Sequence, residues 1–291
     1  MIEIEAGVAE LDAVRLHYVE AAGAEPPLLL IHGATGSHTT YLPFLPTLAQ
    51  HARVYAVDLR GHGLSGRTPG AYRLADYGRD VASFLRTVVV RPAILAGHSL
   101  GGYVALWVAA EEPDLIERLF LEDPPLYLTA LSRLRETMFY QFFTMLRNDL
   151  PAHHARGGTI ADLIGYVGQM PFDEQQTMLD VAGPAWVQER AEQLHHLDPD
   201  MLEPALAGDL LGPYVPDDLL AQVRCPVRLL AAQYEYGGAM NAQDVARAVA
   251  HLAHCEHTVF AGVGHGIHEE QPEAYAQALI QFITASNGGP P

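Results

Sequence analysis

The pentapeptide Gly97-His98-Ser99-Leu100-Gly101 places a serine where its hydroxyl could act as a nucleophile. The apolar run Ala93–Ala96 precedes it, and the apolar-rich run Tyr103–Ala110 follows it. This order predicts a strand, a sharp turn and a helix, with the Ser99 hydroxyl exposed at the helix N-terminus. A serine hydroxyl is a poor nucleophile until a base removes its proton. The motif therefore requires a histidine, an acid to orient that histidine, and N–H groups to hold an oxyanion.

The histidine best placed to act as this base is His265, one of 15 histidines in the chain. It lies in Gly262-Val263-Gly264-His265-Gly266, directly after the strand-like run Thr258–Phe260. Glycines around a histidine at a strand end form a loop that can carry the side chain over the edge of a sheet. His268, three residues further on, is the runner-up.

The expected oxyanion donors are two backbone N–H groups. The first belongs to Leu100, the residue after the nucleophile, because the helix dipole favours negative charge at that end. The second is expected in the loop after an earlier strand, where His32-Gly33-Ala34-Thr35-Gly36 follows Leu28–Ile31. Gly33 lets the backbone turn, so Ala34 is the predicted donor.

Composition limits the classes of partner. The chain has 291 residues, of which 49% are hydrophobic, which indicates a folded globular protein. Its 17 basic and 35 acidic residues give a formal net charge of −18, which argues against nucleic acid and anionic membranes as partners. The sequence shows no signal peptide and no apolar run of spanning length, so the expected location is the cytoplasm.

Histidine and cysteine spacing gives no indication of a metal site. The pairs His153-His154 and His195-His196 are interpreted as solvated surface, because neighbouring residues on a helix point in different directions. Cys225 and Cys255 are too few for a disulfide framework. We therefore expect neither a metal nor an organic cofactor.

Short apolar runs alternate with helical patterns through the first 125 residues, which predicts a parallel sheet with helices on both faces. The expected strands are 14–19, 27–31, 54–57, 93–96, 119–121, 226–230 and 258–260. The expected helices are 41–49, 74–87, 103–110, 131–150, 160–168, 173–181, 185–195 and 274–284. Pro151 is expected to end the helix over 131–150.

The run of helices without strands between 126 and 222 predicts an insertion in the sheet domain. The domain prediction is an α/β core over 1–125 and 223–286, a helical cap over 126–222, and a disordered tail over 287–291. The first cap helix has a dense apolar and aromatic face. Phe139, Phe142, Phe143 and Met145 on it are candidates for an acyl-binding wall, although the same spacing also fits plain packing on the core.

Four motifs in this order resemble the α/β-hydrolase superfamily: Leu30-Ile31-His32-Gly33, Asp58–Ser65, Gly97–Gly102, and Gly264-His265 with Gln271-Pro272-Glu273. The resemblance covers the chain from about Leu16 to Ile283, apart from the insertion. It implies an eight-stranded, mostly parallel sheet with a helical cap after the sixth strand. It also implies Ser99 as nucleophile, His265 as base, and Ala34 and Leu100 as oxyanion donors. The Asp58–Ser65 motif is expected to brace the loop beside the site.

The acid departs from the usual family pattern. Its usual place is an aspartate after the seventh strand, but that loop reads Ala231-Ala232-Gln233-Tyr234-Glu235-Tyr236-Gly237-Gly238. Glu235 is the only carboxylate there. Asp123, after the sixth strand, is the alternative position used by some family members and is our first choice. Glu235 and Glu122 stay open, because the geometry around the imidazole matters more than position in the chain.

Three functions fit these residues. The first is hydrolysis of a carboxylic ester or lactone of a small molecule through an acyl-enzyme on Ser99. The second is carbon–carbon bond hydrolysis, elimination or cyclisation with the same triad. The third is a receptor that binds a small ligand without turnover. The intact set of motifs favours catalysis.

Overall fold

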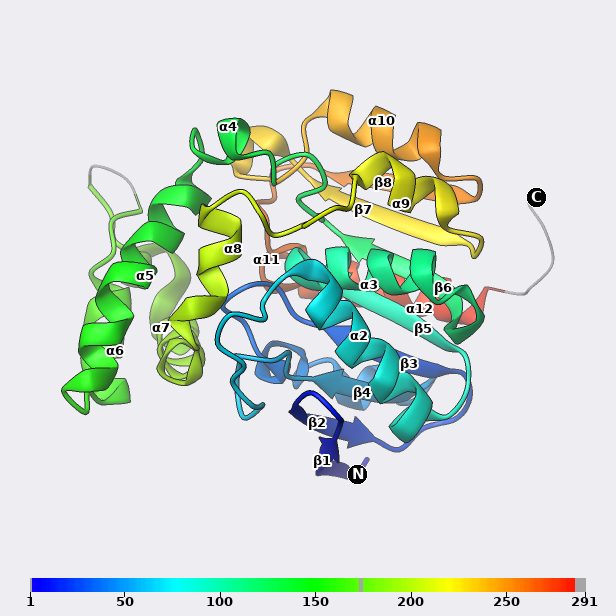
Figure 1. The fold of residues 1–291 in the computed structure, drawn as a ribbon, viewed down its shortest axis with the longest axis horizontal. Coiled ribbons are helices and arrows are strands. Elements are labelled where there is room, and N and C mark those ends of the chain that lie inside the picture. Colours follow the sequence, from blue (N-terminus) through cyan, green and yellow to red (C-terminus); the bar gives the residue numbers. More distant parts are fainter. Residues whose placement is uncertain (1, 173–174, 286–291) are drawn as a thin grey trace.

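An eight-stranded sheet forms the centre of the computed structural model, which describes residues 2–172 and 175–285 (Figure 1). Its strands are β1 (Ile4–Glu10), β2 (Arg15–Ala21), β3 (Pro27–Ile31), β4 (Arg53–Val57), β5 (Ala93–His98), β6 (Ile116–Glu122), β7 (Val227–Ala232) and β8 (Cys255–Phe260). The strand order is β1-β2-β4-β3-β5-β6-β7-β8. The pairs β1–β2 and β2–β4 are antiparallel, and the other neighbours are parallel. The predicted fold class is confirmed, and β1 is a strand that the sequence analysis missed.

Helices cover both faces of the sheet because its central strands are apolar on both sides. Leu29 and Ile31 of β3 join the hydrophobic cluster under α2 (Leu74–Phe84) and α3 (Leu100–Glu111). Leu28 and Leu30 join the cluster on the other face. The helices there are α1 (Leu45–Leu48), α11 (Ile267–Glu270) and α12 (Pro272–Thr284). The remaining core helix, α10 (Ala242–His251), connects β7 to β8.

The chain between β6 and β7 is helical. It contains α4 (Leu131–Leu134), α5 (Met138–Ala155), α6 (Ile160–Gly168), α7 (Met178–His196), α8 (Glu203–Leu206) and α9 (Pro216–Gln222). Figure 1 shows α5 to α8 gathered beyond one end of the sheet, whereas α9 returns to lie against α3. We call α4 to α8 the cap. The predicted tail, 287–291, lies outside the described residues.

Several helix boundaries differ from those expected. The helix expected over 131–150 is two helices, and Thr137 caps the second by accepting the N–H of Tyr140. Pro151 does not end α5, because one lost backbone hydrogen bond is tolerated where Leu146 and Leu150 are packed. The helix expected over 41–49 is instead a 3-10 turn, His38–Tyr41, followed by α1. In α7, Gly183 has non-helical torsions, which divides it near the expected break.

The prediction that both histidine pairs are solvated surface is wrong. His153 is only 3% exposed, and its ring lies 6.1 Å from that of His195, centroid to centroid. His154 and His195 are half-buried, and only His196 is exposed. The cause is that α5 and α7 meet at this point. The sequence around each histidine pair does not show that the two helices are in contact. Burial lowers the pKa of His153 and of His154.

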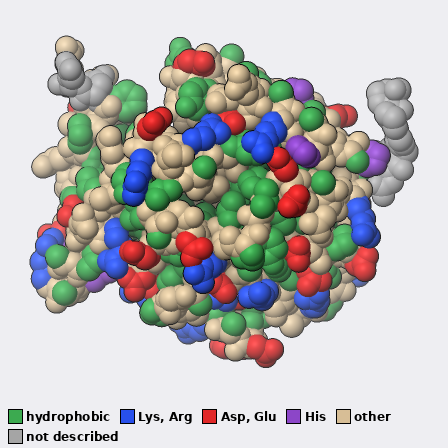
Figure 2. All heavy atoms as spheres, turned by 45° about the horizontal axis from the view of Figure 1, so that its top comes forward, with side chains coloured by type: hydrophobic (Ala, Val, Ile, Leu, Met, Phe, Trp, Pro, Cys, Tyr) green, Lys and Arg blue, Asp and Glu red, His purple; other side chains and the backbone are tan. Residues whose placement is uncertain are grey.

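Acidic and arginine side chains alternate over the face shown in Figure 2. All 17 basic residues are arginine, and several hold carboxylates across separate elements. Arg133 of α4 bonds both oxygens of Asp244 at 2.8 and 2.6 Å, and Arg247 bonds Asp217 at 2.6 Å. These pairs join separate elements of the fold. Within the described ranges, 2–172 and 175–285, the structure contains no helix with the length and apolarity needed to cross a membrane.

Gly101 is where β3 and α3 approach most closely. A Cβ at this position would lie 2.1 Å from the carbonyl oxygen of Ile31. We expect Gly101→Ala to lower stability by about 2 kcal/mol or more, seen as a fall of at least ~4 °C in the melting temperature. The matched control is Gly165→Ala at an exposed position of α6, where nothing lies within 4 Å of the added Cβ, and it is expected to stabilise the protein by about 0.5–1 kcal/mol. A Gly101→Ala protein that melts at or above the wild-type temperature contradicts this account.

Candidate active site

Ser99 lies at the sharp turn between β5 and α3. Its backbone torsions are φ 53° and ψ −117°, which a non-glycine residue rarely adopts. The turn is tight, because a Cβ at Gly97 would lie 2.2 Å from the carbonyl oxygen of Gly101. The Ser99 N–H donates to the carbonyl of Glu122 at 2.9 Å, which attaches the turn to the end of β6. The strained turn is therefore held by its neighbours and presents the hydroxyl at the start of α3.

The structure brings Ser99, His265 and Asp123 together. His265 Nε2 lies 2.8 Å from Ser99 Oγ, and His265 Nδ1 lies 2.7 Å from Asp123 Oδ2. A proton on Nδ1 is donated to the carboxylate, which leaves the Nε2 lone pair facing the serine hydroxyl. In this arrangement the imidazole can take the Ser99 proton.

Among the three carboxylates that the sequence left open, Asp123 is the one that contacts His265. It is fully buried, and its oxygens accept backbone N–H groups of Ala232 at 3.1 Å and Ala239 at 2.8 Å. Glu235 is exposed on the 3-10 turn after β7. The loop after β7 therefore supplies hydrogen-bond donors to the acid.

The two runner-up residues, Glu122 and His268, pair with each other. Glu122 Oε1 accepts the His268 backbone N–H and its Nδ1–H, both at 2.8 Å. Burial alone would raise the pKa of Glu122, but the facing imidazoles of His268 and His98 lower it. Burial alone would lower the pKa of His268, but the Glu122 carboxylate raises it. The two residues therefore form a buried, hydrogen-bonded pair in which each favours the charged form of the other.

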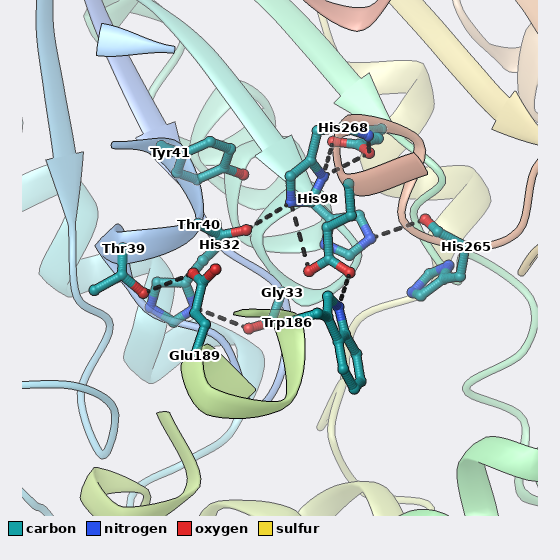
Figure 3. Close-up of polar contacts among 12 residues, drawn as sticks. His32, Gly33, Thr39, Thr40, Tyr41, His98, Trp186, Glu189, His265 and His268 are labelled. Carbon is teal, nitrogen blue, oxygen red and sulfur yellow. Dashed lines mark hydrogen bonds and ion pairs between the residues drawn. The ribbon is translucent and has the colours of Figure 1, made fainter. Parts of the chain in front are cut away.

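His98 connects this pair to the base. Its Nε2–H donates to the carbonyl oxygen of His265 at 3.0 Å, and its ring lies 4.9 Å from that of His268 (Figure 3). Burial lowers the pKa of His98 to about 4, so this imidazole is neutral near pH 7. Thr40 Oγ1 and His268 Nε2 share a hydrogen bond of 2.9 Å. The cluster thus contains His98, which precedes Ser99, Glu122, which precedes Asp123, and His268, which lies three residues after His265. The sequence analysis missed it because its members come from four separate segments.

Ala34 and Leu100 both lie beside Ser99 in the wall of the same cavity. Leu100 is the first residue of α3, so its N–H has no acceptor within the helix. The loop that carries Ala34 is held by His32, whose Nδ1–H donates to Gly33 O at 2.8 Å and whose Nε2 accepts the Leu59 N–H at 3.0 Å (Figure 3). Burial lowers the pKa of His32 to about 3, which keeps its ring neutral.

The Asp58–Ser65 segment holds the adjoining loop. Asp58 accepts hydrogen bonds from His17 Nδ1 at 3.0 Å, from His38 Nδ1 at 2.9 Å and from the Leu64 N–H at 2.9 Å. Arg60 is 3% exposed and bonds both oxygens of Asp80 on α2, at 2.5 and 2.6 Å. These contacts position the loops beside the site and do not reach Ser99.

Among the residues that the structure describes, two clusters have spacing that suits a metal ion: His17, His38 and Asp58, and His98, Glu122 and His268. In each cluster the carboxylate already accepts hydrogen bonds from imidazole N–H groups. The geometry is therefore explained by these hydrogen bonds.

The candidate cap residues line the space above Ser99. A cavity of about 430 Å³ is bordered by Ser99 and His265 and by all four of Phe139, Phe142, Phe143 and Met145. The Phe139 ring lies 4.9 Å from the His265 ring, in an edge-on arrangement. This cavity has the size of ordinary ligand sites.

The far wall of this cavity joins the cap to the core. Arg190 of α7 bonds Glu269 at 3.0 Å. Trp186 Nε1–H donates to the same carboxylate at 2.9 Å (Figure 3). Burial alone would raise the pKa of Glu269, but Arg190 chiefly lowers it, to about 2. Thr39 Oγ1–H donates to Glu189 at 2.9 Å in the same region. These cross-links were not predicted, because nothing in the sequence pairs α7 with the loop after His265.

Comparison with known proteins identifies the family. The profile of the alpha/beta hydrolase family matches residues 28–278. The chain belongs to the alpha/beta hydrolase family. Among curated proteins it is similar to a 2-(acetamidomethylene)succinate hydrolase of Mesorhizobium japonicum, at 37% identity over 36% of this chain and 38% of the relative. The sn-1-specific diacylglycerol lipase of Mus musculus is 24% identical over 94% of this chain and 87% of that protein.

Solved structures of alpha/beta hydrolases share the fold over nearly the whole chain. A hydrolase from Pseudomonas aeruginosa has a TM-score of 0.75 at 25% identity and covers 96% of this chain and 98% of its own. The first curated relative, in contrast, is matched over well under half of its length.

The contact between Asp123 and His265 predicts a specific loss of reactivity. Asp123→Asn is expected to slow phosphonylation of Ser99 by a fluorophosphonate about 10³–10⁴-fold, because the amide favours the wrong imidazole tautomer. Glu235→Gln is the control and is expected to react at the wild-type rate. The measurement is the labelling rate followed by intact-protein mass, with the fold checked by circular dichroism. Equal slowing in both variants, or in Glu235→Gln alone, would show that Asp123 is not the acid.

Proposed function

We propose that this alpha/beta hydrolase is a serine hydrolase that cleaves a carboxylic ester or lactone of a small molecule through an acyl-enzyme on Ser99. The observation that carries the proposal is the continuous hydrogen-bonded chain Ser99–His265–Asp123, at 2.8 and 2.7 Å. A serine connected to a base and a buried acid in this way is an activated nucleophile.

The first half of the proposed reaction is acylation. Ser99 Oγ forms a bond to the carbonyl carbon while its proton passes to His265 Nε2. The N–H groups of Ala34 and Leu100 hold the negative oxygen of the tetrahedral intermediate. Asp123 stabilises the imidazolium, which then protonates the leaving oxygen as the bond from carbon to that oxygen breaks. The acyl group remains on Ser99, and the alcohol departs.

The second half is hydrolysis of the acyl-enzyme. His265 Nε2 takes a proton from a water molecule, whose oxygen attacks the acyl carbon. The intermediate collapses, the bond from carbon to Ser99 Oγ breaks, and Ser99 regains its proton from His265. These steps use side chains, backbone N–H groups and water alone. The apolar cavity walls and the resemblance to a diacylglycerol lipase support an ester as the bond cleaved.

The proposal predicts the behaviour of Ser99→Ala toward p-nitrophenyl acetate and butyrate. We expect turnover to fall at least about 10⁴-fold, because no acyl-enzyme can form. Ser132→Ala, an exposed serine on α4, is the matched control and is expected to retain wild-type turnover. Rapid quenching of the wild-type reaction should show an acyl mass increment on the peptide that contains Ser99. Retained activity in Ser99→Ala, or an acyl group on another residue, refutes the proposal.

A further inference from the structure

The space around Ser99 is divided into two compartments. The large compartment is the cavity of about 430 Å³ already described, and the small compartment has a volume of about 70 Å³. Both are bordered by Ala34, Ser99, Phe139, Phe143 and His265. The reacting carbonyl would therefore lie where the two compartments meet, with room on either side of different size and chemistry.

The small compartment is apolar. Besides the shared residues, its lining includes Leu100, Tyr103, Leu128, Leu202, Ala205 and Leu210. The Tyr103 hydroxyl donates to the carbonyl of Leu126 at 2.6 Å, so its polar group is already satisfied. The volume is about half of the ~150 Å³ apolar cavity that admits benzene, a six-carbon ligand, so the small compartment suits roughly three carbons.

The large compartment has a polar floor and a mostly apolar roof, to which Gln141, Arg190 and Gln193 of the cap add polar groups. The cap supplies Phe142, Trp186 and four of the seven methionines, at 138, 145, 170 and 178. Methionine side chains are flexible and polarizable, and they adapt to ligands of varied shape. The core supplies polar groups that include Thr35, Thr40 and His268. This side can accept a bulky apolar group and also admit water.

The position of His265 decides which half of an ester enters which compartment. The leaving oxygen must face His265 Nε2 to receive a proton. Gly266, His268 and Glu269, which continue the loop after His265, line the large compartment and not the small one. Leu100, at the start of α3, lines the small compartment and not the large one. The leaving group therefore points into the large compartment, and the acyl group points toward α3.

Deacylation supports the same orientation. The acyl group must stay on Ser99 after the alcohol departs, and a water molecule must then reach the acyl carbon next to His265. The vacated large compartment, with its polar floor, provides that path. An acyl chain in the small compartment leaves the path open, whereas a long chain in the large compartment would fill it.

We propose that the enzyme selects open-chain esters of short acyl groups, acetyl to butyryl, with a bulky apolar alcohol. This selectivity rests on the proposed acyl-enzyme at Ser99. It favours open-chain esters over lactones, because a ring carries both halves of the ester together and cannot distribute them between two compartments.

The test varies the two halves of the substrate independently on the wild-type protein. One series holds the alcohol as p-nitrophenol and lengthens the acyl group from acetyl to decanoyl. The other holds the acyl group as acetyl and enlarges the alcohol from methanol to naphthylmethanol. We expect kcat/KM to fall at least tenfold between butyryl and octanoyl, and to rise or stay level as the alcohol grows.

Variants of the small compartment should change the length of the longest acyl group that is hydrolysed efficiently. Ala205→Leu reduces the space and is expected to lower the butyryl-to-acetyl ratio of kcat/KM at least fivefold. Leu210→Ala, at a half-buried position, enlarges it and is expected to raise the octanoyl-to-acetyl ratio by a similar factor. Met170→Ala is the matched control in the large compartment. It should change the dependence on alcohol size and leave the acyl-length ratios as they are.

Each outcome is decisive. The proposal is overturned if the enzyme prefers long acyl groups with small alcohols. It is also overturned if the acyl-length limit changes in Met170→Ala and not in the small-compartment variants. If esters acylate Ser99 but acyl length has no effect, this selectivity fails while the proposed function stands. If no ester acylates Ser99, both fail.

Discussion

The close approach of β5 and α3 at Ser99 is the constraint on which the other contacts at the site depend. It places a serine in a strained conformation, φ 53°, and it is sterically compatible only with glycine at position 97, where a Cβ would meet the carbonyl of Gly101. Glycine at position 101 is required by a neighbouring contact, the approach of α3 to the end of β3. The turn also sets the direction of α3, whose first N–H lies beside the hydroxyl. Strain of this kind persists only where the surroundings hold it, and here the Ser99 N–H is bonded to the end of β6. One turn thus positions both the nucleophile and an expected oxyanion donor.

Histidines around this turn have different tasks that follow from their surroundings. His265 is partly exposed and lies between a hydroxyl and a buried carboxylate. His98 is partly buried and neutral, with its pKa lowered to about 4, and it holds the backbone of His265. His268 carries a raised pKa against Glu122. Glu122 and Asp123 are adjacent at the end of β6. Asp123 bonds the ring of His265, and Glu122 bonds His268 in the segment that follows His265.

Local patterns were enough to predict the parts of the site that depend on short stretches of sequence. The strand–turn–helix around Ser99 and the glycine-flanked His265 needed no long-range information, and the alternation of strands and helices predicted the sheet. The choice between Asp123 and Glu235 depends on how the loop after β7 folds, and there the donors are the N–H groups of Ala232 and Ala239. The meeting of His153 with His195, and the division of the cavity, arise from how the cap helices pack. The hydrophobic periodicity of a single helix does not indicate which other helices it will contact.

The most direct test of the central claim is a crystal structure of the protein after reaction with a p-nitrophenyl alkylphosphonate, whose tetrahedral phosphorus stands in for the tetrahedral carbon of the intermediate. The account predicts phosphorus bonded to Ser99 Oγ and a phosphonyl oxygen within about 3 Å of the Ala34 and Leu100 nitrogens. It also predicts that His265 stays hydrogen-bonded to Asp123. The proposed mechanism is contradicted if the protein remains unmodified or carries the phosphonate on another residue. It is also contradicted if the phosphonyl oxygen points away from both N–H groups.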